Sequence, residues 1–362
     1  GSPDALHPGT AVLAQSHILF ELVYDAMFHL DMDGGFSPNL AKSWRASADG
    51  CTLTYDLRHD AVFHDGQPLT ARDVAFSYNL YKAHPEFPLL HPYTQYFARV
   101  EALGEYQVQI ELAEAIPNIE SQLAFLYVLP AHIWSVHAEG AAAALFANEA
   151  MVGSGPFKLV EYRQGEFVLL AAHKEHPLRA PRIDELVLQT FSSKDALVQA
   201  LRIGQVDAIT EMPHTALAAL RRADDIEILT GTPYLPEVTD IIINQIGPER
   251  CPQGGICSGH PALRDRQVRR ALALAVDKQQ LIDVVLLGMG VPGLTLLPSG
   301  LDAWYNGELA DYSFDPAQAR SALDAAGYVD GDGDGIRQMP GSGAPLNFRL
   351  NWPADMPIAP RM

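Results

Sequence analysis

Apolar residues recur every three or four positions in several parts of the chain, as they do along one face of an amphipathic helix. The first such pattern covers residues 18–30 and consists of Ile18, Leu19, Leu22, Val23 and Met27. Further helices are predicted at about 70–82, 192–203, 265–275, 277–287 and 315–326. Residues suited to a helix N-cap stand at most of these starts, namely Thr70, Ser192, Asp277 and Asp315.

Other segments alternate apolar and polar residues or form short apolar runs, which predicts strands. These segments cover residues 53–58, 108–112, 183–191, 206–210, 226–229, 238–244 and 346–351, and a hairpin is predicted over 157–170 around Gly165. Two of the strands, 183–191 and 206–210, flank the helix at 192–203. This strand–helix–strand order indicates a partly parallel sheet, so the sequence predicts an α/β fold.

The composition indicates a globular protein with more than one domain. The chain has 362 residues, of which 48% are hydrophobic, and single cores stop growing at roughly 250–300 residues. Its net charge of −19 opposes binding to phosphate backbones, so we expect no nucleic-acid partner. No run approaches the roughly 18 apolar residues of a membrane span, so membrane association would require an anchor outside this chain. No export signal is visible either.

Two of the cysteines bear on the compartment. Cys251 and Cys257 bracket a short glycine-containing loop, which permits a disulfide in an oxidising environment. The alternative is two thiols in a surface loop. A zinc site is not expected, because no second cysteine or histidine pair lies nearby at ligand spacing.

An acidic loop near the end of the chain is the sharpest metal signal. Asp330, Asp332 and Asp334 occupy positions 1, 3 and 5 of a half calcium loop, with glycine at position 6 and the backbone carbonyl of Ile336 at position 7. Position 12 is Gly341, so the bidentate carboxylate of a complete loop is missing. The pattern therefore leaves two interpretations, a weak structural Ca²⁺ site and an acidic, glycine-rich turn.

No catalytic motif stands out in the sequence. It contains neither a Gly-x-Ser-x-Gly nucleophile elbow nor a His-Glu-x-x-His zinc motif. The glycines at 153 and 155 precede a predicted hairpin rather than a helix, which excludes the usual phosphate loop. We therefore expect no enzyme. A hydrolase using Glu211 with a histidine is the remote alternative, and a chaperone-like role is another.

Six runs in one order carry a resemblance to a known family. The chain resembles the family-5 extracellular solute-binding proteins of ABC importers, which carry oligopeptides, dipeptides and nickel. The resemblance covers nearly the whole chain and rests on the runs at 36–44, 57–66 with 69–74, 152–158, 201–207, 268–277, and 315–320 with 325–328.

This resemblance implies a two-lobed periplasmic-binding-protein fold with an inserted domain. The base lobe would comprise residues 1–38 and 153–259, the inserted domain 39–152, and the opposing lobe 260–362. Relatives continue beyond the last residue of this chain, so we expect the opposing lobe to be incomplete here. The implied location is the periplasm or the outside of the cell, either free or held at the membrane by a lipid anchor.

The resemblance also implies a function without chemistry. The protein would bind an oligopeptide or dipeptide, close its lobes around it and deliver it to the permease subunits of an ABC transporter; nickel, a sugar or another small solute is the alternative. The positions that match ligand-binding residues of the family are Gln15, Ser16, Tyr93, Tyr96, Glu211 and Asn244. The competing interpretation is that Tyr93 and Tyr96 only pack in the base. We expect no cofactor other than Ca²⁺.

Overall fold

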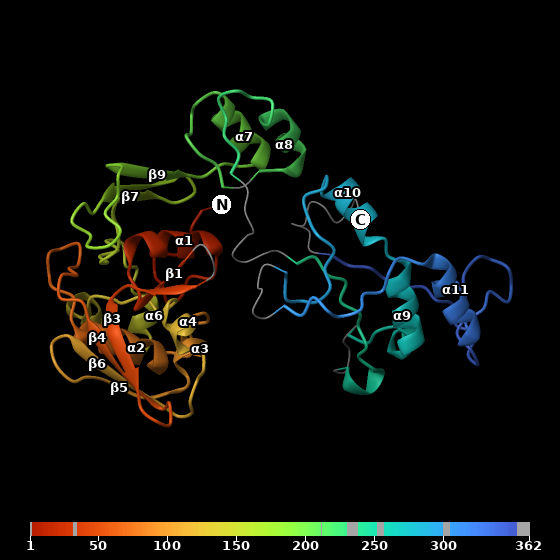
Figure 1. The fold of residues 1–362 in the computed structure, drawn as a ribbon, viewed down its shortest axis with the longest axis horizontal. Coiled ribbons are helices and arrows are strands. Elements are labelled where there is room, and N and C mark those ends of the chain that lie inside the picture. Colours follow the sequence, from red (N-terminus) through yellow and green to blue (C-terminus); the bar gives the residue numbers. More distant parts are fainter. Residues whose placement is uncertain are drawn as a thin grey trace. The chain divides into compact units, whose positions relative to one another are not determined.

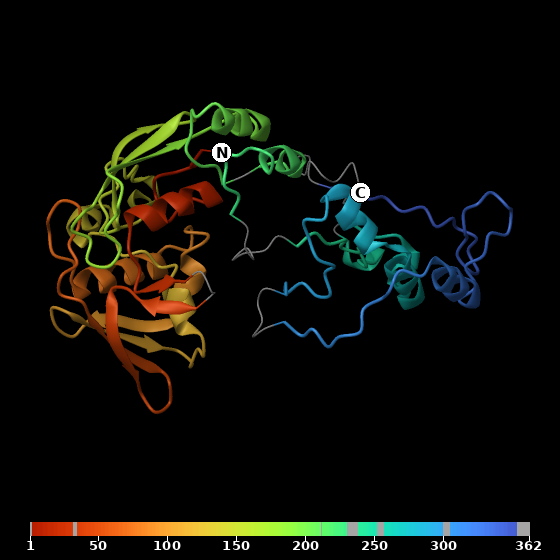
Figure 2. The ribbon, with the colours of Figure 1, turned by 45° about the horizontal axis from the view of Figure 1, so that its top comes forward.

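The computed structural model describes residues 2–31, 35–210, 212–229, 238–251, 257–299 and 305–352. The chain divides into two compact units, residues 1–209 and 210–362 (Figures 1 and 2). Helices and antiparallel strands build the first unit. The described part of the second consists of helices, extended segments and an isolated bridge between Gln338 and Pro345.

A four-stranded antiparallel sheet lies in the first unit, in the spatial order β3-β4-β6-β5. Strand β6 buries every second residue, namely Val108, Ile110 and Leu112, as the sequence predicts for a half-buried strand. The strands are β3 (Ala41–Ala46), β4 (Thr52–Leu57), β5 (Phe97–Ala102) and β6 (Gln107–Leu112).

Helix α2 (Ala71–Ala83) packs against β5 and β6 of this sheet. It begins where the sequence predicts, because the backbone N–H and the hydroxyl of Thr70 both donate to Asp73 Oδ2 at 2.9 Å. The other oxygen of Asp73 accepts the backbone N–H of Ala131 at 3.0 Å. One carboxylate therefore starts the helix and also holds the later chain against it.

Two smaller sheets and several short helices complete the first unit. The predicted hairpin is present as β7 (Phe157–Arg163) and β8 (Phe167–Ala172), and β9 (Glu185–Gln189) pairs with β8. The other sheet pairs β1 (Phe28–Leu30) with β2 (Phe36–Pro38). The helices are α1 (Ala14–Val23), α3 (His91–Thr94), α4 (Ile119–Leu123), α5 (Ala131–Trp134), η1 (Ser135–His137), α6 (Ala142–Leu145) and α7 (Lys194–Arg202).

A buried carboxylate joins distant segments of the first unit. Asp25 is 2% exposed and accepts hydrogen bonds from Arg179 Nη2 (2.6 Å), Asn39 Nδ2 (3.0 Å) and Ser154 Oγ (3.0 Å). His176 Nε2 lies 3.2 Å from its Oδ2. Burial raises the pKa of Asp25, but the contacts with His176 and Arg179 outweigh it, so the pKa lies well below its ordinary value. The folded chain therefore holds Asp25 as an anion.

The glycine run beside this carboxylate lies directly on the chain after α1. A Cβ on Gly153 would lie 1.9 Å from the carbonyl oxygen of Val23, and one on Gly155 would meet the same backbone. The N–H of Gly155 donates to that Val23 oxygen at 2.9 Å. His64 accepts the Gly153 N–H and contacts the Gly155 oxygen, and burial lowers the pKa of His64 to about 4. The run is therefore a packed crossover rather than an anion-binding loop.

The second unit is built on helices whose starts the sequence predicts. Asp265, Asp277 and Asp315 cap α9, α10 and α11 through hydrogen bonds of 2.8–2.9 Å from backbone N–H groups. Helix α11 packs against α9, with Ala271, Leu274 and Ala319 buried between them. The elements are α8 (His214–Leu220), η2 (Pro248–Arg250), η3 (Pro261–Arg264), α9 (Arg266–Ala275), α10 (Lys278–Val285) and α11 (Pro316–Ala325).

The predicted helix over 18–30 is wrong in its position. Helix α1 begins earlier, at Ala14, and ends at Val23. The backbone carbonyls that would continue the helix bind elsewhere, since the Val23 oxygen accepts from Gly155 and the Asp25 oxygen accepts from Val128 at 2.8 Å. Tertiary hydrogen bonds thus override the apolar periodicity, and residues 28–30 form β1 instead.

The prediction of a partly parallel sheet is also wrong for the described residues, where every strand pairing is antiparallel. Helix α7 is present, with Ser193 rather than Ser192 at its N-cap. Residues 206–210, 226–229, 238–244 and 346–351 form no strands, and among the described residues no segment pairs with them in a ladder of backbone hydrogen bonds. Several of their apolar side chains are exposed, including Leu229 at 86% and Ile242 at 85%.

The predicted domain boundaries at 38/39, 152/153 and 259/260 stay a prediction. One hydrophobic core runs from Leu6 to Leu170 and crosses the first two of these boundaries. It includes Phe20 and Tyr24 of the opening segment, Tyr55 and Tyr78 of the sheet and its helix, and Leu170 of β8.

Because Gly153 lies so close to the backbone of Val23, we expect a side chain at this position to destabilise the folded protein. Replacing Gly153 by alanine should lower the free energy of unfolding by roughly 2–4 kcal/mol, because a backbone oxygen blocks the added methyl group. Urea denaturation would measure the loss. Gly104→Ala is the matched control: a Cβ there meets nothing within 4 Å, so its effect should stay within about 0.5 kcal/mol. Equal stability of the two variants would contradict the packing described for the crossover.

Candidate ligand-binding surface

The start of α1 is fixed by hydrogen bonds to the residues that precede it. Ser16 is fully buried, and its hydroxyl donates to Asp4 Oδ1 at 2.6 Å while accepting the Asp4 N–H at 3.0 Å. The same carboxylate accepts the N–H groups of Val12 and Leu13. Burial raises the pKa of Asp4, but these hydrogen bonds outweigh it and the net pKa is lowered. The hydroxyl of Ser16 is therefore engaged within the fold, whereas Gln15 beside it is half-buried.

Further along α1, His17 and Glu21 lie one turn apart beside an aromatic group. The His17 ring stacks on Tyr127 with centroids 6.3 Å apart and meets the edge of Phe20 at 5.5 Å. Desolvation lowers the pKa of His17 and raises that of Glu21, and the charge of Arg179 opposes the shift at Glu21. This face of α1 therefore combines an aromatic wall with two titratable side chains.

Tyr127 links α1 to one of the predicted tyrosines. Desolvation raises the pKa of the Tyr127 hydroxyl far above its ordinary value, and nearby Glu21 and Tyr93 raise it further. Tyr93, in α3, is half-buried and stacks on Phe125 with centroids 6.0 Å apart and planes 19° apart. We call His17, Glu21, Tyr93, Phe125 and Tyr127 the α1–aromatic cluster.

The structure brings together only some of the predicted ligand residues. Tyr93 belongs to the α1–aromatic cluster, and Gln15 lies at the start of the same helix as His17. Tyr96 is 37% exposed, and its backbone oxygen accepts the Ala113 N–H at 2.9 Å. Glu211 lies outside the described residues. Their assignment as ligand contacts stays a prediction.

Asn244 lies in the second unit and also has a role within the fold. Its Nδ2 donates to the Cys257 oxygen at 2.9 Å, and its Oδ1 accepts the Ile246 N–H at 2.9 Å. Cys251 and Cys257 are joined as a disulfide with their Cα atoms 5.5 Å apart. Asn244 therefore holds the segment that leaves this disulfide.

The sequence alone did not indicate His17, Glu21, Phe125 and Tyr127. The spacing of His17 and Glu21, four residues apart on a helix, was the available signal for the first pair. For the second pair, the signal was two aromatic residues at alternate positions, 125 and 127. Neither signal connects the pairs, because their contact depends on the tertiary fold.

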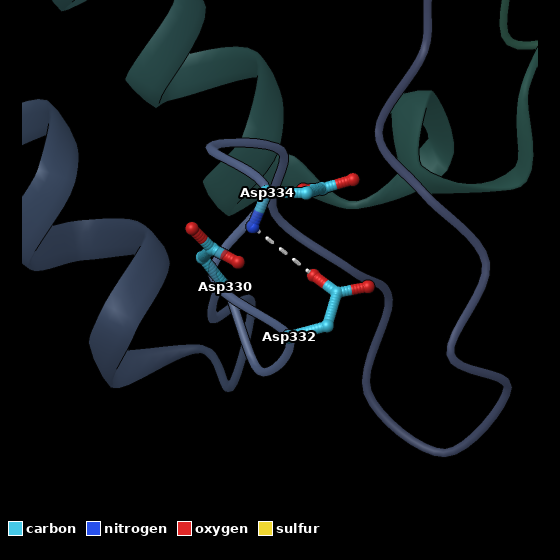
Figure 3. A group of neighbouring side chains, drawn as sticks. All are labelled: Asp330, Asp332 and Asp334. Atoms are coloured by element: carbon cyan, nitrogen blue, oxygen red, sulfur yellow. Dashed lines mark hydrogen bonds between the residues drawn. The ribbon is translucent and has the colours of Figure 1, made fainter.

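The acidic loop gathers its three aspartates as the metal pattern requires. Carboxylate oxygens of Asp330, Asp332 and Asp334 lie within 4.8 Å of one another, and all three residues are exposed (Figure 3). Asp330 also accepts the N–H groups of Gly333 and Gly335, which lowers its pKa. The backbone oxygen of Ile336 accepts from Gln338 Nε2 at 2.8 Å. The oxygens fit a hard cation in kind, although the loop supplies fewer of them than a complete calcium loop.

A family model ties these features to known proteins. Residues 35–362 match the model described as "Bacterial extracellular solute-binding proteins, family 5 Middle". The chain belongs to this family. The resemblance inferred from the six sequence runs is therefore confirmed. Among the described residues of this family-5 protein, no helix combines the length and the apolar character needed to cross a membrane.

Individual relatives share the sequence at moderate identity. A putative ABC transporter peptide-binding protein of Brucella ovis, BOV_A0352, is 27% identical over 297 residues, which cover 80% of this chain and 52% of the relative. The family-5 chain thus spans about half the length of this relative.

Solved structures show the fold. NikZ from Campylobacter jejuni, in complex with Ni(L-His), matches with a TM-score of 0.74 at 23% identity, over 95% of this chain and 64% of that one. The oligopeptide-binding protein AppA from Bacillus subtilis, in complex with a nonapeptide, matches with a TM-score of 0.70 at 22% identity, over 95% and 66%. The fold class is therefore the predicted α/β, two-lobed periplasmic-binding-protein type.

Two adjacent predicted ligand residues are expected to differ in their effect on stability. Ser16→Ala should lower the free energy of unfolding by about 1–2 kcal/mol without any ligand, because it leaves the Asp4 carboxylate and N–H short of a buried partner. Gln15→Ala should cost less than about 0.5 kcal/mol, since Gln15 is only half-buried. Chemical denaturation of both variants would measure the difference. A larger loss for Gln15→Ala than for Ser16→Ala would contradict the role given to the Asp4–Ser16 pair.

Proposed function

We propose that this chain is part of a receptor that captures a short peptide outside the cytoplasm and delivers it to the permease subunits of an ABC importer. The family match over residues 35–362 carries the proposal, because the family is described as extracellular and solute-binding. The peptide is supported by the names of relatives, which include the Brucella peptide-binding protein and the Bacillus oligopeptide-binding protein.

The α1–aromatic cluster suits such a ligand. Tyr93 stacks on Phe125 and is only half-buried, which suits covering an apolar side chain of a peptide. The amide of Gln15, at the start of the same helix as His17, can pair with both N–H and C=O groups of a peptide backbone. We propose Gln15, Tyr93 and Tyr96 as ligand contacts, with His17 and Glu21 as neighbouring polar groups. Ser16 is proposed to act indirectly, by fixing the start of α1.

Capture requires no bond to form or break. In the proposed mechanism, a ligand that binds the closed form more tightly than the open form shifts the population of the two lobes toward closure. The permease then receives the closed form. The protein is proposed to work as a binding protein rather than an enzyme, at the cell exterior and either free or lipid-anchored. The hydrolase alternative would need Glu211 beside a histidine, and Glu211 lies outside the described residues.

Nickel is the alternative ligand, because one of the similar solved structures, NikZ, is in complex with Ni(L-His). A bound Ni²⁺ ion favours imidazole ligands. Among the described residues, the only group of at least three metal-ligating side chains within reach of one another is the exposed Asp330–Asp334 loop, which contains no histidine. The names of the peptide-binding relatives favour a peptide over nickel.

The peptide proposal predicts a loss of affinity at Tyr93. In the complete protein, Tyr93→Ala should weaken binding of a peptide taken from a di- to nonapeptide library by about tenfold, because the stacked ring is removed. Isothermal titration calorimetry would measure it. Tyr106→Ala is the matched control, since Tyr106 stacks on His59, outside the cluster, and its removal should leave affinity unchanged. The absence of binding to every peptide, or an equal loss in both variants, would refute the proposal.

We also propose that the aspartates of the acidic loop bind Ca²⁺ in a structural role. Three carboxylates and the Ile336 carbonyl would provide only part of the 6–8 oxygens that Ca²⁺ prefers, so the affinity should be weak. Millimolar CaCl₂ should raise the melting temperature of the wild type but not that of Asp332→Asn. Asp207→Asn, at an exposed carboxylate in the first unit, should keep the response. An unchanged melting temperature of the wild type would overturn the proposal.

A further inference from the structure

Three arginines and a tyrosine surround a hollow in the second unit. The hollow has a volume of about 230 Å³ and is lined by Arg266, Arg269, Arg270 and Tyr312. This volume is below the roughly 300–1,000 Å³ of pockets that enclose drug-sized ligands, so it suits a small ion or group. No carboxylate is among its lining residues, although the chain as a whole has a net charge of −19.

The arginines project from one side of α9. Arg266 precedes Arg269 by three residues and Arg270 by four, and side chains at these spacings are neighbours on a helix. Like charges at these spacings repel one another. The N-cap of α9 is Asp265, whose carboxylate accepts a backbone N–H of the first turn, so the positive charge of the hollow comes from the guanidinium groups. The site is therefore strongly positive.

Nearby carboxylates are committed to other partners. Asp265 accepts the Gln267 N–H at 2.8 Å and the Tyr328 hydroxyl at 2.9 Å. Asp311, next to Tyr312 in sequence, binds Lys278 Nζ through both oxygens at 2.8 Å. Within the described part of the chain, neither Arg266 nor Arg270 forms an ion pair, and both are exposed. Neither guanidinium group is therefore in direct contact with a carboxylate in that part of the chain.

Arg269 gives the hollow a fixed wall. Its Nη1 donates to the backbone oxygens of Leu263 and Arg264 at 3.0 and 2.8 Å, which holds the half-buried guanidinium in one orientation. Tyr312 is brought to the same hollow by the Asp311–Lys278 ion pair and by the Asp315 N–H, which donates to the Leu274 oxygen of α9 at 2.8 Å. Tyr312 thereby adds a neutral, hydroxyl-bearing side chain to a lining that is otherwise made of arginines.

We propose that this hollow binds a small multivalent oxyanion, either a phosphate group or a polycarboxylate. Guanidinium groups match both chemistries, because their planar N–H forks bind two oxygens of one anion. The bound anion would relieve the repulsion among the three arginines and would stabilise the start of α9. The argument for this site does not rest on peptide capture.

The proposal is tested with inorganic phosphate and with citrate, each titrated at constant ionic strength in chloride buffer. Calorimetry should detect binding of at least one of them by the wild type, with a matching rise in melting temperature. The double variant Arg266→Gln/Arg270→Gln should bind it at least about tenfold more weakly, because two charge-assisted contacts are lost. Arg320→Gln, which removes one arginine charge at an exposed position of α11 outside the hollow, should bind like the wild type.

A second measurement separates binding from a purely structural role. In chloride buffer alone, the double variant should melt at the same temperature as the wild type or higher, since like-charge repulsion has been removed. Sedimentation with phosphatidylglycerol vesicles tests whether a lipid headgroup is the source of the phosphate. In that case the wild type should bind the vesicles and the Arg266→Gln/Arg270→Gln variant should bind them more weakly. The proposal is overturned if phosphate, citrate and vesicles all fail to bind, or if the double variant binds as tightly as the wild type.

Discussion

The buried carboxylate of Asp25 sets a constraint on the whole first unit. An isolated charge in a protein interior is costly, so it must be surrounded by donors and opposite charge. Those partners are Asn39, Ser154, His176 and Arg179, which come from three separate stretches of the chain. Satisfying one carboxylate therefore requires the opening segment, the crossover after residue 152 and the loop after β8 to meet at one point.

The crossover explains how this meeting is geometrically possible. Glycines at 153 and 155 let the chain lie against the Val23 carbonyl at a distance that any side chain would prevent. The carbonyl of Gly155 is in turn contacted by His64 and His173, so the hairpin β7–β8 begins from a fixed point. The face of α1 that carries His17 and Glu21 is positioned by the same packing, because α1 ends at Val23. The order of the candidate binding surface thus depends on contacts made at the end of α1.

The sequence predicts the structure correctly where the deciding contacts are between residues close together in the chain. Thr70, Asp277 and Asp315 cap helices as their side chains suggest, and the hairpin around Gly165 forms where its strands alternate. It was insufficient where a distant partner decides the outcome. The apolar periodicity of 18–30 continues past Val23, but hydrogen bonds from Gly155 and Val128 end the helix there. Likewise, Tyr93 was predicted as a contact from resemblance, while its connection to α1 runs through Tyr127, whose ring stacks on His17 across 110 residues of sequence.

The long separation between Asp25 and its partners has a consequence for biosynthesis. Arg179 follows Asp25 by 154 residues, so the carboxylate leaves the ribosome well before its counterion exists. At roughly 5–20 residues per second, the gap lasts on the order of ten to thirty seconds. During that time Phe20, Tyr24 and the other core residues of the opening segment have no complete hydrophobic environment to enter. Completion of the first unit therefore requires the segment that carries Arg179, because Asp25 buried without it would lack its arginine counterion.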